Sequence, residues 1–259
     1  MSRLSTLNRS IDGRVAIITG AASGMGRATA HLFSDEGAKV AVVDRNAEGV
    51  DAVVREITDA GGTAKGYVVD LADGDAIPGL VHRVRGDLGP IDILINNAGI
   101  SLPGVLTDAH WEDNWLKSFA VNITAQAKLI RACHDDLIRN ADGRVVNIAS
   151  TEGLGATKGM SPYTSSKTGV TGLTRSLALE YGDKGVTVNC ICPGPIRTGM
   201  TASIDDEAKN KFARRRVPLR RYGDPEEVAQ ITLSLVLPAA SYLNGAIIPV
   251  DGGMMAQNT

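Results

Sequence analysis

The segment Arg14-Val-Ala-Ile-Ile-Thr-Gly-Ala-Ala-Ser-Gly-Met-Gly26 decides the fold of this chain. Its apolar, β-branched first half is typical of a buried strand that ends at Gly20, and a helical pattern opens after Gly24. Glycines at a helix start let backbone N–H groups approach an anion, which the helix dipole also attracts. The spacing G-x-x-x-G-x-G differs from the G-x-G-x-x-G fingerprint, and no Lys-Ser/Thr follows as in a P-loop. The segment predicts an anion-binding loop, with a plain turn as the alternative.

An acidic residue follows the next apolar run at a distance that suits a dinucleotide site. The run Val40-Ala-Val-Val43 ends in Asp44, eighteen residues after Gly26. A carboxylate there accepts hydrogen bonds from the adenosine ribose and repels a 2′-phosphate, which predicts NAD. Arg45 favours the opposite choice, because a guanidinium can pair with a 2′-phosphate. NADP is therefore the less favoured cofactor.

Apolar runs alternate with amphipathic segments along the chain. We expect strands near 14–19, 39–43, 65–69, 91–95, 143–149, 186–192 and 246–250, and helices near 24–36, 46–60, 73–86, 112–139, 161–182 and 225–237. This repetition requires right-handed crossovers and gives a parallel sheet covered on both faces. The predicted fold is α/β, a single Rossmann-like domain over 1–259 with a doubly wound sheet of seven strands. The polar insertion 197–221, with a helix near 205–216, is expected to cover the site as a lid.

Composition argues against several classes of protein. The 259 residues are 43% hydrophobic, enough for one core, and a net charge of −2 without a long basic block disfavours nucleic acid as a partner. Without an apolar leader or a run of about 18 apolar residues, we expect a cytoplasmic location and no membrane partner. Cys133, Cys190 and Cys192 lack the spacing of a zinc site, and we expect buried thiols, with Cys190 and Cys192 on one side of a strand.

The spacing Tyr163-x-x-x-Lys167, with Ser150 thirteen residues upstream, indicates proton transfer. Residues four apart share a helix face, so the phenol and the ammonium are expected to point into one space. A free phenol ionises only near pH ~10, and a neighbouring positive charge lowers that value. We therefore expect Tyr163 to exchange a proton with an alcohol oxygen. This spacing is common on surface helices, so by itself it is weak evidence for catalysis. The glycine loop in the same chain is what makes a catalytic role the better interpretation.

Together these motifs resemble the short-chain dehydrogenase/reductase family over residues 13–253. The matching segments, in the family's order, are Thr19-Gly-x-x-x-Gly-x-Gly26, Asp70, Asn96-Asn-Ala-Gly99, Asn122, Asn147-Ile-Ala-Ser150, Tyr163, Lys167, Pro193-Gly-Pro-Ile-Arg-Thr198 and Val250-Asp-Gly-Gly253. The resemblance implies an NAD(P)-dependent oxidoreductase, often a homotetramer, whose chemistry needs no metal. The long helices predicted at 112–139 and 161–182 pair across a dimer face in relatives, so a homodimer or homotetramer is expected.

The resemblance also assigns roles to single residues. Tyr163 exchanges the proton, Ser150 hydrogen-bonds the substrate oxygen, Lys167 lowers the tyrosine pKa and holds the nicotinamide ribose, and Asn122 holds a water that links Lys167 to solvent. The expected cofactor-binding residues are Gly20, Ser23, Gly24, Met25, Gly26, Asp44, Arg45, Asp70, Leu71, Asn97, Ala98, Gly99, Tyr163, Lys167, Pro193, Gly194, Ile196 and Thr198. Ser23 stands where phosphate-binding relatives often carry a basic residue, which again favours NAD.

The leading functional hypothesis is an NAD-dependent dehydrogenase of a secondary alcohol, or the reverse ketone reductase. The alternative is an NADPH-dependent 3-oxoacyl-thioester (acyl carrier protein) reductase, which Asp44 disfavours and a basic insertion favours. The basic residues of that insertion are Lys209, Lys211, Arg214, Arg215, Arg216, Arg220 and Arg221. These residues either form a basic lid that binds an anionic substrate or belong to a helix face exposed to solvent. A protein that binds NAD without turnover is disfavoured, because Tyr163 and Lys167 are both present.

Some residues near the expected site have two open interpretations. Glu152 stands where the family often has a small residue; it either accepts a hydrogen bond from a substrate or is a solvated loop carboxylate. The candidate apolar substrate contacts, for which packing is the alternative role, are Leu102, Met160, Ile196 and Met200.

Overall fold

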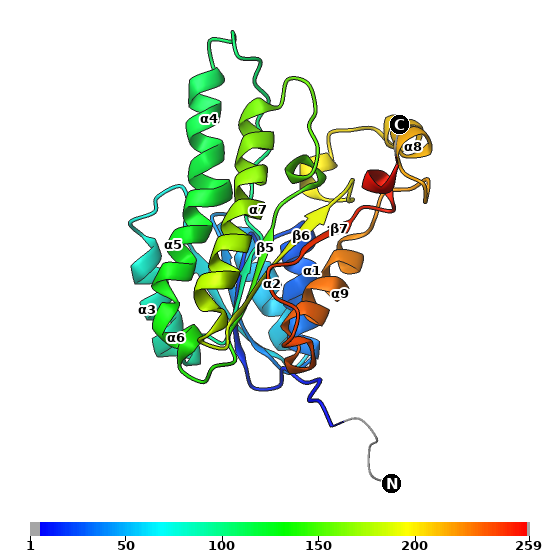
Figure 1. Ribbon diagram of the computed structural model, residues 1–259. Coiled ribbons are helices and arrows are strands. Elements are labelled where there is room, and N and C mark those ends of the chain that lie inside the picture. Colours follow the sequence, from blue (N-terminus) through cyan, green and yellow to red (C-terminus); the bar gives the residue numbers. More distant parts are fainter. Residues whose placement is uncertain (1–5, 258–259) are drawn as a thin grey trace.

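The computed structural model describes residues 6–257, and its strands form one sheet (Figure 1). The strands are β1 (Val15–Thr19), β2 (Lys39–Asp44), β3 (Thr63–Val68), β4 (Ile93–Asn96), β5 (Arg144–Ile148), β6 (Thr187–Pro193) and β7 (Ile247–Val250). Their order is β3-β2-β1-β4-β5-β6-β7, and every neighbouring pair is parallel. This confirms the predicted doubly wound sheet of seven strands. The order reverses between β1 and β4, where the loops at the carboxyl edge diverge and leave room for a ligand.

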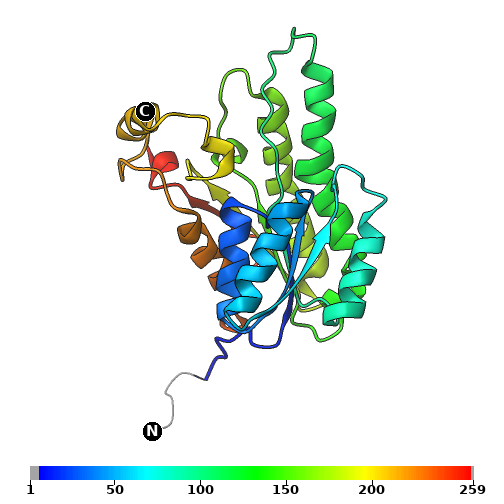
Figure 2. The same cartoon turned by 180° about the vertical axis from the view of Figure 1, so that it is seen from behind.

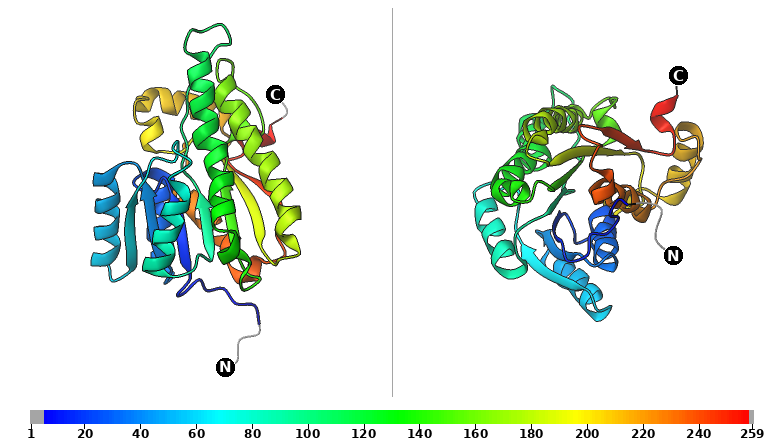
Figure 3. Two further views of the ribbon diagram at one scale, coloured as in Figure 1. Left: turned by 90° about the vertical axis from the view of Figure 1, so that its left-hand side faces the viewer. Right: turned by 60° about the horizontal axis from the view of Figure 1, so that its bottom comes forward.

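Helices cover both faces of the sheet (Figures 1 and 2). One face carries α1 (Gly24–Asp35), α2 (Ala47–Asp59) and α9 (Pro225–Val236), and the other carries α3 (Ile77–Leu88), α4 (Trp111–Phe119), α5 (Ala125–Ala132), α6 (His134–Ile138) and α7 (Ser161–Gly182). Successive strand residues face opposite ways, so Ile17 packs in one apolar layer and Ile18 in the other. The remaining helix, α8 (Asp206–Arg216), lies beyond the carboxyl edge, and its last residue accepts a hydrogen bond from the Gln257 side chain (Figure 3).

The ends of the predicted elements agree with the structure to within a few residues. The helix predicted at 161–182 is α7, and the helix predicted in the insertion is α8. The largest shift is at α3, which begins at Ile77 instead of residue 73. The side chains of Asp70 and Asp73 accept hydrogen bonds from the N–H groups of residues 72 and 75 and hold turns there, and Pro78 suits the first turn of a helix.

The helix predicted over 112–139 has the expected extent but is not one regular α-helix. After α4 the chain makes a π-helical turn (Ala120–Thr124), continues as α5, and breaks at Cys133 before α6. The turn contains Asn122, whose Oδ1 accepts the N–H of Ile100 at 2.9 Å. Its Nδ2 donates to the Ile100 carbonyl and to the Ser166 hydroxyl, both at 3.0 Å. The wider turn lets one buried amide reach both the loop after β4 and α7.

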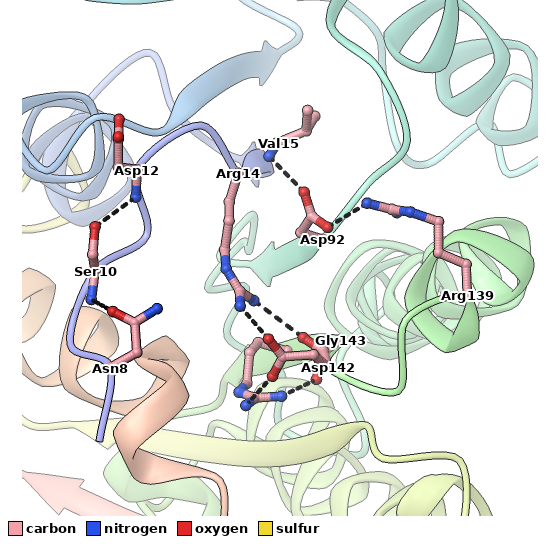
Figure 4. Close-up of polar contacts among 10 residues, drawn as sticks. Asn8, Ser10, Asp12, Arg14, Val15, Asp92, Arg139, Asp142 and Gly143 are labelled. Atoms are coloured by element: carbon pink, nitrogen blue, oxygen red, sulfur yellow. Dashed lines mark hydrogen bonds and ion pairs between the residues drawn. The ribbon is translucent and has the colours of Figure 1, made fainter. Parts of the chain in front are cut away.

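Ion pairs close the amino-terminal edge of the sheet, opposite the ligand edge (Figure 4). The buried Arg144 at the start of β5 pairs with Asp142, which also binds Arg14 before β1. Asp92, just before β4, accepts a hydrogen bond from Arg139 at 2.6 Å. Each buried or half-buried arginine here has a carboxylate partner, which offsets the cost of taking its charge out of water.

Candidate active site

A cleft of about 520 Å³ opens at the carboxyl edge of the sheet, bounded by the loops after β1 to β4 and by the start of the insertion. The predicted cofactor residues that line it are Gly20, Ser23, Gly24, Met25, Asp44, Arg45, Asp70, Leu71, Asn97, Ala98, Gly99 and Thr198. Further lining residues, which the sequence did not single out as ligand contacts, are Val69, Ile100, Ser101, Val121 and Gly199. Most of them are the immediate neighbours in sequence of a motif residue, and this adjacency could have predicted that they line the cleft. The cleft also reaches Leu102 and Met200, predicted as substrate contacts.

The glycine loop is shaped by contacts between backbone atoms. A Cβ on Gly26 would stand 2.2 Å from the Gly20 carbonyl oxygen, so glycine alone lets α1 begin this close to β1. Gly26 therefore lies under the loop and not in the cleft wall. Gly20 adopts a φ of +65°, which favours glycine. The side chain of Ser23, the N-cap of α1, makes no capping hydrogen bond. The first-turn N–H groups of α1 can therefore bind an anion in the cleft.

The loop after β4 is fixed to Thr19 and Gly20 by four hydrogen bonds, one of them from the Asn97 side chain to the Gly20 carbonyl at 3.3 Å. The hydroxyl of Thr19 accepts the N–H groups of Asn97 and Ala98, both at 3.0 Å. The Asn97 side chain donates in return to the Thr19 carbonyl at 2.8 Å. These bonds explain why threonine precedes the glycines and why asparagine directly follows the neighbouring strand β4. They hold two walls of the cleft together.

Asp44 stands at the end of β2, at one end of the cleft. Its Oδ1 accepts the N–H of Asn46 at 3.0 Å, and its Oδ2 accepts the N–H of Ala22 at 3.2 Å. A carboxylate has about four acceptor sites, so both oxygen atoms can accept further donors such as ribose hydroxyls. Together with the amino end of α1, this carboxylate makes the cleft a good fit for a dinucleotide.

Tyr163 and Lys167 lie on one face of α7, as predicted. The Lys167 Nζ is 5.8 Å from the centre of the Tyr163 ring. Lys167 Nζ donates to the Ile148 carbonyl at 2.9 Å. Ser150 follows β5 and acts on the Tyr163 phenol through its hydroxyl. Side chains from β5 and α7 therefore meet at the carboxyl edge of the sheet.

Gly99 connects these groups to the cleft. A Cβ on Gly99 would stand 3.1 Å from Lys167 Nζ and 3.3 Å from Asn122 Oδ1. Lys167 thus adjoins the cleft at Gly99. The Asn122 amide is bonded to Ile100 and Ser166, so it positions the loop after β4. Its role in holding a water stays a prediction.

Burial controls the titration of the phenol and the ammonium. Loss of water raises the pKa of Tyr163, the Ser150 hydroxyl lowers it, and Glu152 raises it further. Loss of water lowers the pKa of Lys167 to about 8. We predicted that Lys167 makes the phenol acidic. In the protein without a bound cofactor, desolvation of the phenol outweighs the Ser150 hydroxyl, so the pKa of Tyr163 is raised. Its lowering by Lys167 beside a bound nicotinamide stays a prediction.

Besides Gly26, Tyr163 and Lys167, three more residues predicted to bind the cofactor do not line the cleft. Pro193 ends β6, and the N–H of Gly194 donates to the Val250 carbonyl at 3.0 Å. Ile196 is buried in the apolar layer next to α9, which favours a packing role over contact with a substrate. The turn that contains these residues instead sets the position of Thr198, whose Cγ2 would be 3.1 Å from a Cβ on Gly24.

Within residues 6–257, no three His, Cys, Asp or Glu side chains converge as metal ligands, and no helix is long and apolar enough to cross a membrane. Cys133, Cys190 and Cys192 are buried and free. Cys190 and Cys192 pack in one cluster, which confirms their predicted placement on one side of the strand.

Comparison with known proteins identifies the family of this chain. A family model described as enoyl-(acyl carrier protein) reductase matches residues 20–255, which is most of the chain. The chain belongs to the short-chain dehydrogenase/reductase family. It is 38% identical to the 3-oxoacyl-(acyl-carrier-protein) reductase of Thermotoga maritima over 95% of this chain and 99% of that protein. It is also 38% identical to the meso-2,3-butanediol dehydrogenase of Serratia marcescens, over 95% of this chain and 96% of that protein.

Solved structures of short-chain dehydrogenases/reductases share the fold. A structure from Beutenbergia cavernae, described as an NAD(P)-dependent gluconate 5-dehydrogenase with bound NADP, superimposes with a TM-score of 0.90 at 36% identity and covers 96% of this chain and 100% of its own. The L-sorbose reductase of Gluconobacter frateurii, complexed with NADPH and L-sorbose, gives a TM-score of 0.91 at 28% identity, with 97% and 100% coverage. This chain is therefore an oxidoreductase of a family that uses a nicotinamide cofactor.

Proposed function

We propose that this short-chain dehydrogenase/reductase uses NAD to transfer a hydride between a secondary alcohol and its ketone. The observation that carries the proposal is the placement of Tyr163 and Lys167 on one face of α7, next to Ser150 and to Gly99 in the wall of the cleft. These are the groups needed to move a proton at a substrate oxygen beside a bound nicotinamide.

The proposed chemistry divides between cofactor and protein. When bound, the nicotinamide accepts the hydride from the carbinol carbon or returns it to the carbonyl carbon. Tyr163 takes the hydroxyl proton during oxidation and gives it back during reduction. The Ser150 oxygen already accepts the Glu152 N–H at 3.1 Å, so its own O–H can donate to the substrate oxygen. The Lys167 charge stabilises the phenolate that forms during oxidation.

Substituting Tyr163→Phe tests this assignment. We expect turnover to fall by about 10³-fold or more, since the variant lacks the hydroxyl that exchanges the proton in the proposed mechanism. Cofactor binding, followed by isothermal titration calorimetry, should persist, because the phenol does not line the cleft. Turnover at the wild-type rate would remove Tyr163 from the mechanism.

We propose NAD as the cofactor in preference to NADP. Asp44 supports this choice, because its carboxylate lines the cleft and repels a 2′-phosphate. Arg45 lines the same end of the cleft and could pair with that phosphate, and the two solved relatives contain NADP or NADPH. We expect kcat/KM to be at least about tenfold higher with NAD, and Asp44→Ser to reduce that ratio. A preference for NADP in the wild-type enzyme would overturn the assignment.

The second candidate function is NADPH-dependent reduction of a 3-oxoacyl thioester on acyl carrier protein. It is favoured by relatives with that activity in their names and by Arg214, Arg215 and Arg216 in the last turn of α8. The two functions separate in a panel of secondary alcohols, polyols and 3-oxoacyl thioesters assayed with both cofactors. Turnover of thioesters alone, with NADPH, would establish the second function.

Three further features belong to the same proposal. We propose a single domain in which residues 197–221 form a lid, because Thr198 at its start contacts the glycine loop. We propose a homodimer or homotetramer through α4 and α7, where Leu116 is 60% and Leu179 is 86% exposed. We propose a cytoplasmic location, which suits three buried thiols. Light scattering that gives a monomer mass at micromolar concentration would contradict the assembly.

A further inference from the structure

The carboxylate of Glu152 accepts hydrogen bonds from two threonines of this chain. Its Oε2 accepts the N–H of Thr157 at 3.0 Å and the hydroxyl of Thr164, and its Oε1 accepts the hydroxyl of Thr157. Thr157 lies in the loop that follows β5, and Thr164 lies in the first turn of α7, next to Tyr163. Three of about four acceptor sites are therefore used. This contradicts the interpretation of Glu152 as a solvated loop carboxylate and leaves little capacity for a substrate.

The main chain of Glu152 makes a second connection to the site. Its N–H donates to the Ser150 Oγ at 3.1 Å, and its carbonyl accepts the Thr168 hydroxyl at 3.5 Å. Thr164 and Thr168 are four residues apart, so they share a face of α7, and each directly follows a catalytic residue. Glu152 is thus attached to α7 next to Tyr163 and again next to Lys167.

These contacts decide where the Ser150 hydroxyl can point. Because the Ser150 oxygen accepts the N–H of Glu152, its hydrogen is free to be donated to the phenol of Tyr163 or to a substrate oxygen. Movement of the segment 151–157 away from α7 would turn this hydroxyl away from the site. The side-chain bonds of Glu152 oppose that movement.

We propose that Glu152 is a positioning residue of the catalytic centre, which clamps the segment 151–157 onto α7, directs the Ser150 hydroxyl and holds a negative charge near the Tyr163 phenol. The inference rests on the proposed function for the roles of Ser150 and Tyr163. The clamp itself rests on the contacts alone.

Groups from three elements act on the Tyr163 phenol. The Ser150 hydroxyl comes from the end of β5, the Glu152 carboxylate from the short turn after it, and the Lys167 ammonium from α7 itself. The two buried thiols of β6 act on Lys167. Glu152 raises the pKa of Tyr163 and so favours the protonated phenol, in opposition to the Ser150 hydroxyl. Removing the carboxylate charge must therefore move formation of the phenolate to lower pH.

Glu152→Gln tests the inference, because the amide keeps the shape and an acceptor oxygen but loses the charge. In the ligand-free protein, tyrosine labelled with carbon-13 at Cζ reports ionisation by NMR, and Tyr163→Phe identifies the right resonance among the five tyrosines. We expect Tyr163 to ionise at lower pH in Glu152→Gln than in the wild type. We also expect the melting temperature to fall by about 2–4 °C, because charged hydrogen bonds become neutral ones.

Two control variants separate the clamp from the charge. Thr164→Val removes one donor and keeps the carboxylate, so the melting temperature should fall without a downward shift in Tyr163 ionisation. Glu36→Gln removes an exposed charge at the end of α1, on the opposite edge of the sheet, and should change neither quantity. An unchanged or upward shift in Glu152→Gln overturns the charge effect, and unchanged melting in both Glu152→Gln and Thr164→Val overturns the clamp.

The NMR and melting measurements need no turnover, so they distinguish this inference from the proposed function. A wild-type enzyme that is inactive on every alcohol and ketone, with the expected Tyr163 shift, would refute the function and support the clamp. In an active enzyme, alcohol oxidation should reach its plateau at lower pH in Glu152→Gln. An unshifted pH profile would count against Glu152 as a positioning residue.

Discussion

The two edges of the sheet bury a basic side chain in opposite ways. At the amino-terminal edge, Arg144 is 1% exposed and pairs with Asp142. At the carboxyl edge, Lys167 is 3% exposed, and its ammonium donates to the Ile148 carbonyl. Among residues 6–257 no carboxylate forms an ion pair with Lys167. One buried charge is compensated inside the protein, and the other is left available to a ligand.

The difference separates groups that maintain the fold from groups that serve chemistry. Burial lowers the pKa of both side chains, but Asp142 acts against that effect at Arg144. A charge buried without a partner destabilises the folded state, and it is retained where a reaction needs it. Stability and activity should therefore respond in opposite senses at the two edges.

The largest expected effect is at Lys167. In Lys167→Met we expect turnover to fall by about 10³-fold, because the charge that stabilises the phenolate is lost. The ligand-free protein should melt about 2–4 °C higher, since an uncompensated buried charge is replaced by an apolar chain of similar length. Steady-state kinetics and scanning calorimetry measure the two changes. A lower melting temperature would contradict the claim that the buried charge of Lys167 destabilises the fold.

Arg144→Met should act in the reverse sense. The free energy of unfolding should fall by about 3 kcal/mol, because the variant loses a buried ion pair and a hydrogen bond to the Gly143 carbonyl. The kcat of the folded enzyme should stay at the wild-type value, since Arg144 lies at the far edge. Urea unfolding and kinetics at low temperature test both points, and a large loss of kcat would show that the two edges are coupled.

A smaller loss of activity is expected when one methyl group is added at the carboxyl edge of the sheet. Gly99→Ala places a Cβ 3.1 Å from Lys167 Nζ, so the ammonium must shift by a few tenths of an ångström. We expect kcat/KM to fall roughly tenfold through this misplacement. Gly86→Ala in α3 is the matched control, because its Cβ meets no atom within 4 Å. Equal activity of the two variants would mean that the position of the ammonium is not critical.

The smallest effect is the pH dependence of stability. Folded Lys167 has a pKa of about 8, below its ordinary value of 10.5, so between these values the unfolded chain binds more protons. The contribution of Lys167 to the free energy of unfolding therefore rises with pH from about 8 towards 10. The raised pKa of Tyr163 acts in the opposite direction only above the ordinary value of 10.0. Urea unfolding of wild type and Lys167→Met at pH 8 and 9.5 should show a steeper rise for the wild type; parallel slopes would contradict the shift.

The sequence by itself determined the fold class and the places of the motif residues along the strands. The spacing of apolar residues in strands and helices is a local property of the chain. The strand before Gly20 and the helix after Gly24 could therefore be predicted from the sequence alone. Parallel strands bring their carboxyl ends to one edge, which is why residues from separate motifs could be predicted to line one cleft. The four-residue spacing of Tyr163 and Lys167 likewise fixed their common face on α7.

Only the tertiary structure decided how those groups behave. The raised pKa of Tyr163 comes from burial under several segments, and no spacing in the chain reports how much water is removed. The π-helical turn depends on contacts of Asn122 with Ile100 and Ser166, which are 22 and 44 residues away. The partners of Glu152 likewise depend on how one loop lies on α7. Local periodicity encodes which face a residue occupies, whereas solvent exclusion and long-range hydrogen bonds exist only once the chain has packed.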